Sequence, residues 1–207
     1  MTLEVMTKVN MFLIFFPRKF LETVIAKLTR NKLSSPLTFA EFLRYIGIWL
    51  LIVRSSPGNM NRKEFWSKKA ISRKRGAPYR FNDLMTGSRF EDITNALEYT
   101  DKAAPTYKDR FWEVRQMIEE WNNNMKDMFI PAWITCLDES MSIWTNRWTC
   151  PGWVFCLRKP HPFGNEYHTI ACGLSGILFR MEMVEGKDRP SELPKDPKAK
   201  STSNLLL

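Results

Sequence analysis

The sequence predicts an α+β chain, with a helical first half followed by three or four short antiparallel strands. Apolar residues recur every three or four positions through residues 39–53 and 109–129, which is the period of a helix with one buried face. After Pro131 the pattern changes to short runs rich in β-branched and aromatic residues, separated by turn-forming residues. The 207 residues are 44% hydrophobic, which is enough for a folded core and excludes wholesale disorder.

The helical half contains recognisable start signals. Residues 1–35 are predicted to form a helical extension. Thr38 is followed three residues later by Glu41, the pattern of a capping box that starts a buried helix. Ser88 is the expected cap of a further helix. Residues 109–129 form the clearest helix, and its apolar face could serve the core or a dimer interface.

The strand-like runs after Pro131 are separated by turn signals, which predicts a β-meander. Pro151-Gly152 and Ser175-Gly176 are two of these signals. Gly173 and Gly176 around Ser175 resemble a nucleophile elbow only loosely, because the second glycine comes one residue early. We therefore interpret this stretch as a hairpin turn. The four runs cover residues 133–144, 152–158, 167–174 and 176–186.

Positive charge is concentrated in one segment. The chain has 31 Lys and Arg against 22 Asp and Glu, a net charge of +9, which favours a polyanionic partner, nucleic acid first. Residues 62–80 hold eight of the cations against Glu64 alone. A run of cations is usually a solvated loop, and it can also grip phosphates or serve as a nuclear address. Phe65, Trp66 and Tyr79 lie among these cations, which makes a DNA-contacting surface as strong an interpretation as the solvated loop. The DNA-binding candidates here are Lys68, Lys69, Arg73, Lys74 and Arg75.

Cysteine usage and hydropathy indicate a cytosolic or nuclear protein. The four cysteines include no C-x-x-C pair, so reduced thiols are expected. No segment has the features of a signal peptide or of a membrane-spanning helix. A zinc site could use two cysteines and the two histidines, but its spacing lacks tight ligand pairs. We expect instead that Cys136, Cys156 and Cys172 are small core residues on strands, with His168 beside them; the zinc alternative is Cys150, Cys156, His161 and His168.

Two adjacent acids, Asp138 and Glu139, interrupt an apolar run and have three interpretations. They can lie in an exposed loop, or form an ion pair with Arg147 or Arg158. They can also supply a metal ligand from a rigid strand, because Mg²⁺ prefers hard oxygen ligands. Two-metal phosphoryl chemistry needs at least two convergent carboxylates, so Asp138 alone cannot perform it.

The stretch LDESMSIWTNRW, followed by RKPHPFGNEYH, resembles the piggyBac family of transposases. In that family an Asp-Glu pair ends the first strand of an RNase H-like catalytic domain, and an Arg and a Lys-Pro-x-x-aromatic-Gly turn follow. Upstream, EFWSKKA and SRFEDITNALEY resemble the family's helical patterns. The resemblance covers roughly residues 36–190. The matching positions are Asp138, Glu139, Arg147, Lys159, Pro160, Phe163 and Gly164.

The resemblance implies a nuclear, Mg²⁺-dependent DNA transposase in which three Asp residues bind two metal ions. Asp138 matches the first of the three and is the expected catalytic and metal-binding residue. Arg147, Arg158 and Lys159 are expected DNA contacts. DNA is the implied partner, a homodimer is possible, and neither a membrane nor a small-molecule substrate is expected.

The same resemblance implies an incomplete enzyme. The second and third catalytic Asp would lie beyond Leu207, and Asn165-Glu166 stands where the family often has a Lys. We therefore expect a truncated transposase remnant that does not cleave DNA by itself. The alternative is a domesticated, non-catalytic module that binds DNA or protein. The expected segments are 1–35 (extension), 36–130 (DNA-binding or dimerisation region), 131–187 (partial RNase H-like domain) and 188–207 (polar loop).

Overall fold

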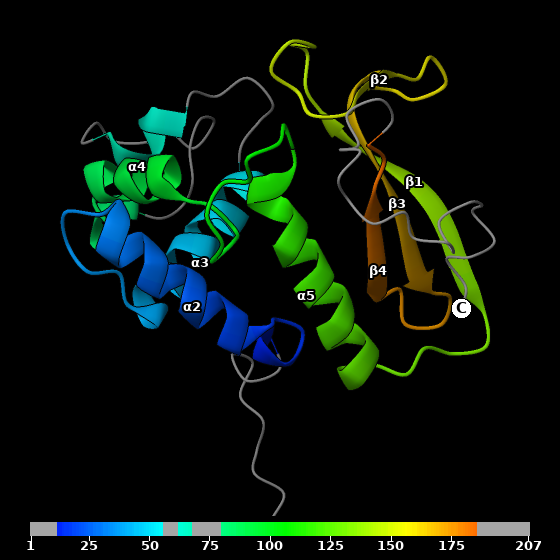
Figure 1. The fold of residues 1–207 in the computed structure, drawn as a ribbon, viewed down its shortest axis with the longest axis horizontal. Coiled ribbons are helices and arrows are strands. Elements are labelled where there is room, and N and C mark those ends of the chain that lie inside the picture. Colours follow the sequence, from blue (N-terminus) through cyan, green and yellow to red (C-terminus); the bar gives the residue numbers. More distant parts are fainter. Residues whose placement is uncertain (1–11, 56–61, 68–79, 186–207) are drawn as a thin grey trace, which may run out of the picture. The chain divides into compact units, whose positions relative to one another are not determined.

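The computed structural model describes residues 12–55, 62–67 and 80–185, and its described elements are mixed helices and a small antiparallel sheet (Figure 1). The chain divides into two compact units, residues 21–101 and residues 1–20 with 102–207. The helices are α2 (Arg18–Asn31), α3 (Phe39–Ser55), α4 (Gly87–Ala96) and α5 (Trp112–Met128), with short 3₁₀ turns at η1 (Arg62–Trp66) and η2 (Phe81–Asp83). The strands are β1 (Thr135–Ile143), β2 (Trp153–Phe155), β3 (Phe163–Cys172) and β4 (Leu178–Met183).

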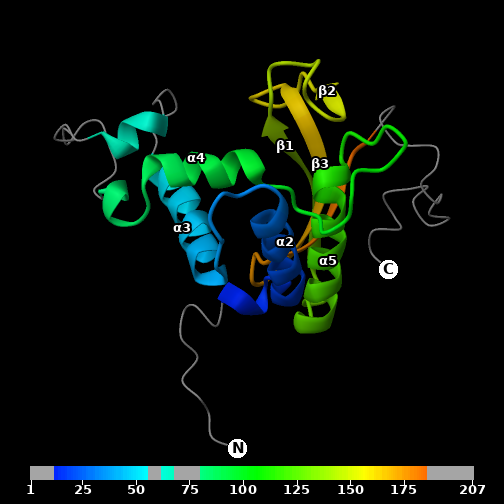
Figure 2. The ribbon, with the colours of Figure 1, turned by 60° about the vertical axis from the view of Figure 1, so that its left-hand side comes forward.

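The described part of residues 21–101 forms a helical unit (Figure 2). Aromatic side chains form much of its core. Tyr45 of α3 packs on Phe90 of α4 with ring centroids 5.0 Å apart. Phe65 of η1 stacks on Phe81 of η2 at 4.9 Å, and both rings are buried. Because these contacts join elements that are distant in sequence, burial of the rings holds the unit together.

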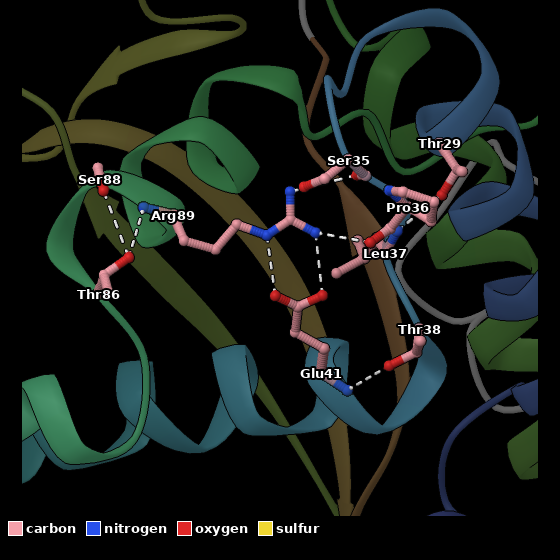
Figure 3. Close-up of polar contacts among 9 residues, drawn as sticks. All are labelled: Thr29, Ser35, Pro36, Leu37, Thr38, Glu41, Thr86, Ser88 and Arg89. Atoms are coloured by element: carbon pink, nitrogen blue, oxygen red, sulfur yellow. Dashed lines mark hydrogen bonds and ion pairs between the residues drawn. The ribbon is translucent and has the colours of Figure 1, made fainter.

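Arg89 connects the starts of α3 and α4 (Figure 3). Its guanidinium donates to both carboxylate oxygens of Glu41, at 2.8 and 2.9 Å, and to the carbonyl oxygens of Ser35 and Pro36. These bonds outweigh partial burial and lower the pKa of Glu41. A capping box has two hydrogen bonds, and the first is confirmed: the Thr38 hydroxyl accepts from the Glu41 N–H at 3.1 Å. The second bond, from the Thr38 N–H to the Glu41 carboxylate, is not observed, because Arg89 occupies that carboxylate.

The cap predicted for the next helix was assigned to the wrong residue. Thr86, not Ser88, precedes α4, and its hydroxyl accepts from the Arg89 N–H at 3.3 Å. Ser88 lies inside the first turn, where its hydroxyl is 3.3 Å from that of Thr86. The helix therefore starts two residues earlier than a Ser88 cap implies, at Gly87, where the absence of a Cβ accommodates the nearby Trp66 side chain.

The sheet is centred on β3 (Figure 1). β1 pairs with β3 along all nine of its residues, antiparallel, whereas β2 and β4 pair with different parts of the opposite edge of β3. The predicted meander order is therefore wrong, because β1 lies beside β3 and not beside β2. β2 has only three residues and offers too few ladder positions for the longer β1.

β3 also begins earlier than predicted. Phe163 and Gly164, expected in a turn, are its first two residues. Gly164 has φ +155°, and a Cβ there would lie 2.0 Å from the Ser142 carbonyl oxygen. Only glycine lets the two strand backbones approach so closely at this point. The hairpin predicted between β3 and β4 is confirmed, with Gly176 at φ +68°.

Helix α5 is attached to β4 by side chains that bond its backbone. Asn122 donates to the Met181 carbonyl at 2.8 Å and accepts from the Met181 N–H at 2.9 Å, so it covers that edge of β4 as another strand would. Arg115 forms ion pairs with Asp109 at 2.8 Å and with Glu185 at 2.7 Å. Burial raises the pKa of the Asp109 carboxyl, but the Arg115 and Phe111 N–H hydrogen bonds outweigh burial and leave it lowered.

Replacing Arg89 with Met should reduce the free energy of unfolding by about 2 kcal/mol, because it leaves Glu41 and two carbonyl groups without their donor. Chemical denaturation followed by circular dichroism measures this loss. Arg44→Met, an exposed arginine on the same α3, is the matched control and should change stability by less than about 0.5 kcal/mol. Equal effects of the two variants would contradict the role of Arg89.

Asp109 should make stability depend on pH in the acid range. Its lowered pKa contributes stability that is complete above the unfolded value of about 3.9 and is lost as the pH falls through the folded value. Asp109→Asn should be less stable than the parent chain at pH 7, by about 2 kcal/mol, and the gap should narrow toward pH 3. Urea unfolding at both pH values measures the gap, and a constant gap would refute the assignment.

Candidate functional site

The acidic pair lies within a strand, so its two side chains point to opposite faces of the sheet. Asp138 and Glu139 are the fourth and fifth residues of β1, opposite Thr169 and His168 of β3. Successive residues of a strand alternate between faces. The expectation that the pair ends its strand is wrong, because β1 continues to Ile143 through pairing with the early part of β3. The exposed-loop interpretation is excluded for the same reason.

Asp138 is an exposed carboxylate on the face that it shares with Ser140 and Thr169. Its side chain is 71% exposed. One of its oxygens accepts from the Glu139 N–H at 2.8 Å and lies 3.9 Å from the Lys159 ammonium. Thr169 donates to the Asp138 carbonyl oxygen at 3.2 Å. Asp138 is thus held at its backbone, and its carboxylate is open to solvent.

Glu139 is engaged by the loop between β2 and β3. Arg158 forms an ion pair with the Glu139 carboxylate, and the Lys159 ammonium donates to the Glu139 backbone carbonyl. The ion-pair interpretation is therefore confirmed for Arg158 with Glu139. Arg147 does not take part, since its guanidinium lies over the Trp148 ring, 4.3 Å from the centroid.

The backbone of Glu139 is capped on the outer edge of β1. Its N–H is bonded to the Asp138 carboxylate and its C=O to Lys159. Edge strands expose unpaired N–H and C=O groups that invite pairing with other chains, and side chains that satisfy them reduce that risk. Asp138 and Lys159 therefore have a structural role in satisfying the backbone of Glu139, independently of any role in metal or DNA binding.

The opposite face holds a cluster that sequence reasoning missed. Glu139, Glu166 and His168 each place one potential ligand atom within 4.8 Å of the others. Among the described residues this is the one group of at least three acidic, histidine or cysteine side chains with metal-binding geometry, and it excludes Asp138. Strand alternation could have suggested Glu166 with His168, but only the β1–β3 register adds Glu139.

The residues beside Asp138 do not by themselves make a magnesium site. On its face of the sheet the neighbouring positions of β1, β3 and β4 carry hydroxyl, amide, aromatic and apolar side chains, and none of these described strand positions is acidic. Mg²⁺ is usually held by at least one or two carboxylates together with waters or substrate phosphates. Asp138 could supply one ligand, and no reaction step follows from it alone.

The cysteines do not form the zinc site considered above, because no described cluster contains two of them with a histidine. Cys172 is buried as expected, but Cys136 is exposed on β1 and Cys156 lies beyond β2, so those two core assignments are wrong. Hydrogen bonds from the Ser175 hydroxyl and from the Ala132 and Ser175 N–H groups lower the pKa of the Cys172 thiol to about 7. Cys172 pairs with Thr135 at the start of β1, apart from the acidic pair.

The basic segment is described only at its ends. Lys68, Lys69, Arg73, Lys74 and Arg75 lie outside the described residues. Arg62 is structural, since it donates to both Glu91 oxygens at 2.8 and 3.0 Å. Phe65 is 1% exposed, and Trp66 donates its indole N–H to the Met85 carbonyl at 2.9 Å. Phe65 is therefore a core residue and cannot offer its ring to DNA, whereas Trp66 is half-buried, with its ring against Phe81 and Phe90.

Exposed cations and aromatic rings do occur on the loops flanking β2. Arg147 and Trp148 lie between β1 and β2, and Trp148 is 77% exposed. Arg158, whose side chain is 68% exposed, and the half-buried Lys159 lie between β2 and β3. Among the described residues this is where the predicted DNA contacts lie.

Comparison with known proteins identifies the family. A family model described as Transposase IS4 matches residues 7–207 of this chain. The chain belongs to this transposase family, of the piggyBac type. No curated protein matches it.

A solved structure shows the same fold. The cryo-EM structure of a piggyBac transposase synaptic complex with hairpin DNA superposes on the present chain with a TM-score of 0.70, at 14% sequence identity. The match covers 92% of this chain and 41% of that chain, so the chain spans less than half the length of its structural neighbour. The predicted α+β fold, with part of an RNase H-like domain, is confirmed. In the described residues no helix combines the length and apolarity needed to cross a bilayer.

Proposed function

We propose that this piggyBac-type chain binds DNA as part of transposase function and does not cleave DNA by itself. The observation that carries the proposal is the position of Asp138. It projects from the middle of β1, the strand to which the resemblance assigns the first catalytic Asp, yet no acidic neighbour shares its face among the described strand positions. Two-metal cleavage needs convergent carboxylates.

DNA binding is supported by charge and by the loops around β2. The net charge of +9 attracts a polyanion, and Arg147, Arg158 and Lys159 lie on those loops. Arg147 stacked on exposed Trp148 combines a cation with an aromatic face, which suits unpaired bases as well as phosphates. The structural neighbour is a complex with hairpin DNA. Lys68, Lys69, Arg73, Lys74 and Arg75, which lie outside the described residues, are further proposed DNA contacts.

Asp138 is the proposed metal ligand. Members of the family are generally metal-dependent. In the proposal Asp138 holds Mg²⁺ only together with carboxylates from outside the described residues, and the metal supplies charge stabilisation at the phosphodiester. Lys159, 3.9 Å from Asp138, balances its charge when no metal is present.

The finer assignments belong to the same proposal. Residues 36–130 act in DNA binding or dimerisation, residues 131–187 are the partial catalytic domain, and residues 1–35 are an extension. Residues 188–207, expected to be a polar loop, lie outside the described residues. The protein works in the nucleus, on DNA and not on a small molecule, and a homodimer is compatible with the exposed apolar residues Leu50 and Val53 of α3.

A second function is favoured by the contacts of Arg158 and Lys159. These cations already engage Glu139 and approach Asp138, so the acidic pair has a role in capping β1 without any metal. That arrangement suits a domesticated module that binds DNA or protein and no longer needs Asp138. Mg²⁺ binding that depends on Asp138 supports the transposase role, and its absence supports the module.

DNA binding should weaken steeply with salt. If six phosphates are neutralised, the logarithm of the binding constant should fall with the logarithm of salt concentration with a slope of about −5. Fluorescence anisotropy with a labelled duplex measures this slope. Replacing Arg147, Arg158 and Lys159 together with Gln should make the slope shallower by about 3. Lys126→Gln, an exposed lysine in the last turn of α5, should leave it unchanged to within about 1.

The chain should not nick supercoiled DNA in the presence of Mg²⁺. A single strand-borne carboxylate cannot hold the two metal ions of the reaction, so product should stay at the level of the metal-free control. Agarose electrophoresis of the plasmid gives the measurement. Nicking that requires Mg²⁺ and disappears in Asp138→Ala would overturn this part of the proposal, whereas DNA binding would stand.

A further inference from the structure

Glu139, Glu166 and His168 lie on the face of the sheet opposite to Asp138. One ligand atom from each is within 4.8 Å of the other two, and all three residues are half-buried. Glu139 is directly opposite His168 in the β1–β3 ladder, and Glu166 precedes His168 by two residues on the same strand. Residues two apart on a strand share a face, so all three side chains lie on one face of the sheet. The two strands that carry them, β1 and β3, run side by side (Figure 1).

The ladder brings Glu139 and His168 especially close. Glu139 directs its N–H to the Asp138 carboxylate and its C=O to Lys159, so neither group is used in pairing with β3. Such a position is a non-hydrogen-bonded pair, in which opposite residues of an antiparallel ladder approach most closely. The short separation is therefore built into the backbone and does not depend on loop placement.

The charges at the cluster are incompletely balanced. In the described part of the chain, neither the Glu166 carboxylate nor the His168 imidazole has a side-chain hydrogen bond or ion pair. Arg158 engages one oxygen of Glu139, which leaves the other available. Two carboxylates this close repel each other unless a cation or a proton lies between them.

We propose that Glu139, Glu166 and His168 form a binding site for a divalent transition-metal ion, with Zn²⁺ as its best-fitting representative. One imidazole nitrogen with two carboxylate oxygens is a ligand set that suits Zn²⁺, whereas Mg²⁺ prefers oxygen ligands alone. Three protein ligands leave a coordination position for water. Arg158 orients Glu139 from outside the ligand set, as hydrogen-bonded partners of metal ligands commonly do.

This site is separate from the proposed role of Asp138. Adjacent residues of β1 project from opposite faces, so a cation bound by Glu139 and its partners is not the Mg²⁺ that Asp138 would hold. Loss of one site should leave the other intact. The inference therefore does not rest on the proposed function.

Zinc titration of the full chain tests the site. The ¹⁵N resonances of the His168 imidazole should shift on addition of one equivalent of Zn²⁺, while those of His161, the other histidine of the chain, should not. This readout is insensitive to zinc bound at thiols, and it needs no variant beyond His161→Gln for assignment. Mg²⁺ at the same concentration should produce no such shift.

Variants then identify the ligands. Glu166→Gln and His168→Gln should each weaken Zn²⁺ binding in calorimetry by at least about tenfold. His161→Gln and Asp138→Asn should retain it, and circular dichroism checks that each variant is folded. The site is refuted if His168 does not shift with Zn²⁺ in the parent chain, if Mg²⁺ reproduces the shift, or if Asp138→Asn removes the binding.

Discussion

The antiparallel ladder between β1 and β3 is the constraint on which the site depends. It runs the whole length of β1 and aligns Asp138 with Thr169 and Glu139 with His168. A slip of one residue would move every side chain of β1 to the other face. Gly164 helps to exclude such slips, because only at glycine can β3 approach the Ser142 carbonyl so closely. The register therefore decides which acid is open to solvent and which one meets His168.

The two faces created by this ladder have different chemistry. Asp138 is exposed beside hydroxyl groups, whereas Glu139 lies in a half-buried group of charged and metal-binding side chains. The loop between β2 and β3 serves both, since Arg158 pairs with the Glu139 carboxylate and Lys159 with its backbone. A loop that is expected to contact DNA thus also stabilises the edge of the strand that carries the acids. Phosphate binding by these two side chains would compete with their contacts to β1.

Away from the sheet, arginines with several acceptors connect elements that are distant in sequence. Arg89 joins the starts of two helices in the helical unit, and Arg115 joins the start of α5 to Asp109 and Glu185. The planar guanidinium can bond two carboxylate oxygens at once, which a lysine cannot do with the same geometry. Part of the positive charge of this chain is therefore used inside the fold. Net charge alone overstates the cations available to DNA, as Arg62 also shows.

The sequence by itself determined the order of the elements, the α+β class and the family. Helical periodicity and the change of period at Pro131 depend on local patterns, and the motif around Asp138 is a contiguous string. It also indicated that Arg158 could pair with Glu139. Tertiary structure alone decided that β1 lies beside β3, that Phe65 is a core residue, and that Glu139 meets Glu166 and His168. These facts depend on strand register and on burial between distant segments, and residue patterns along the chain do not encode either one locally.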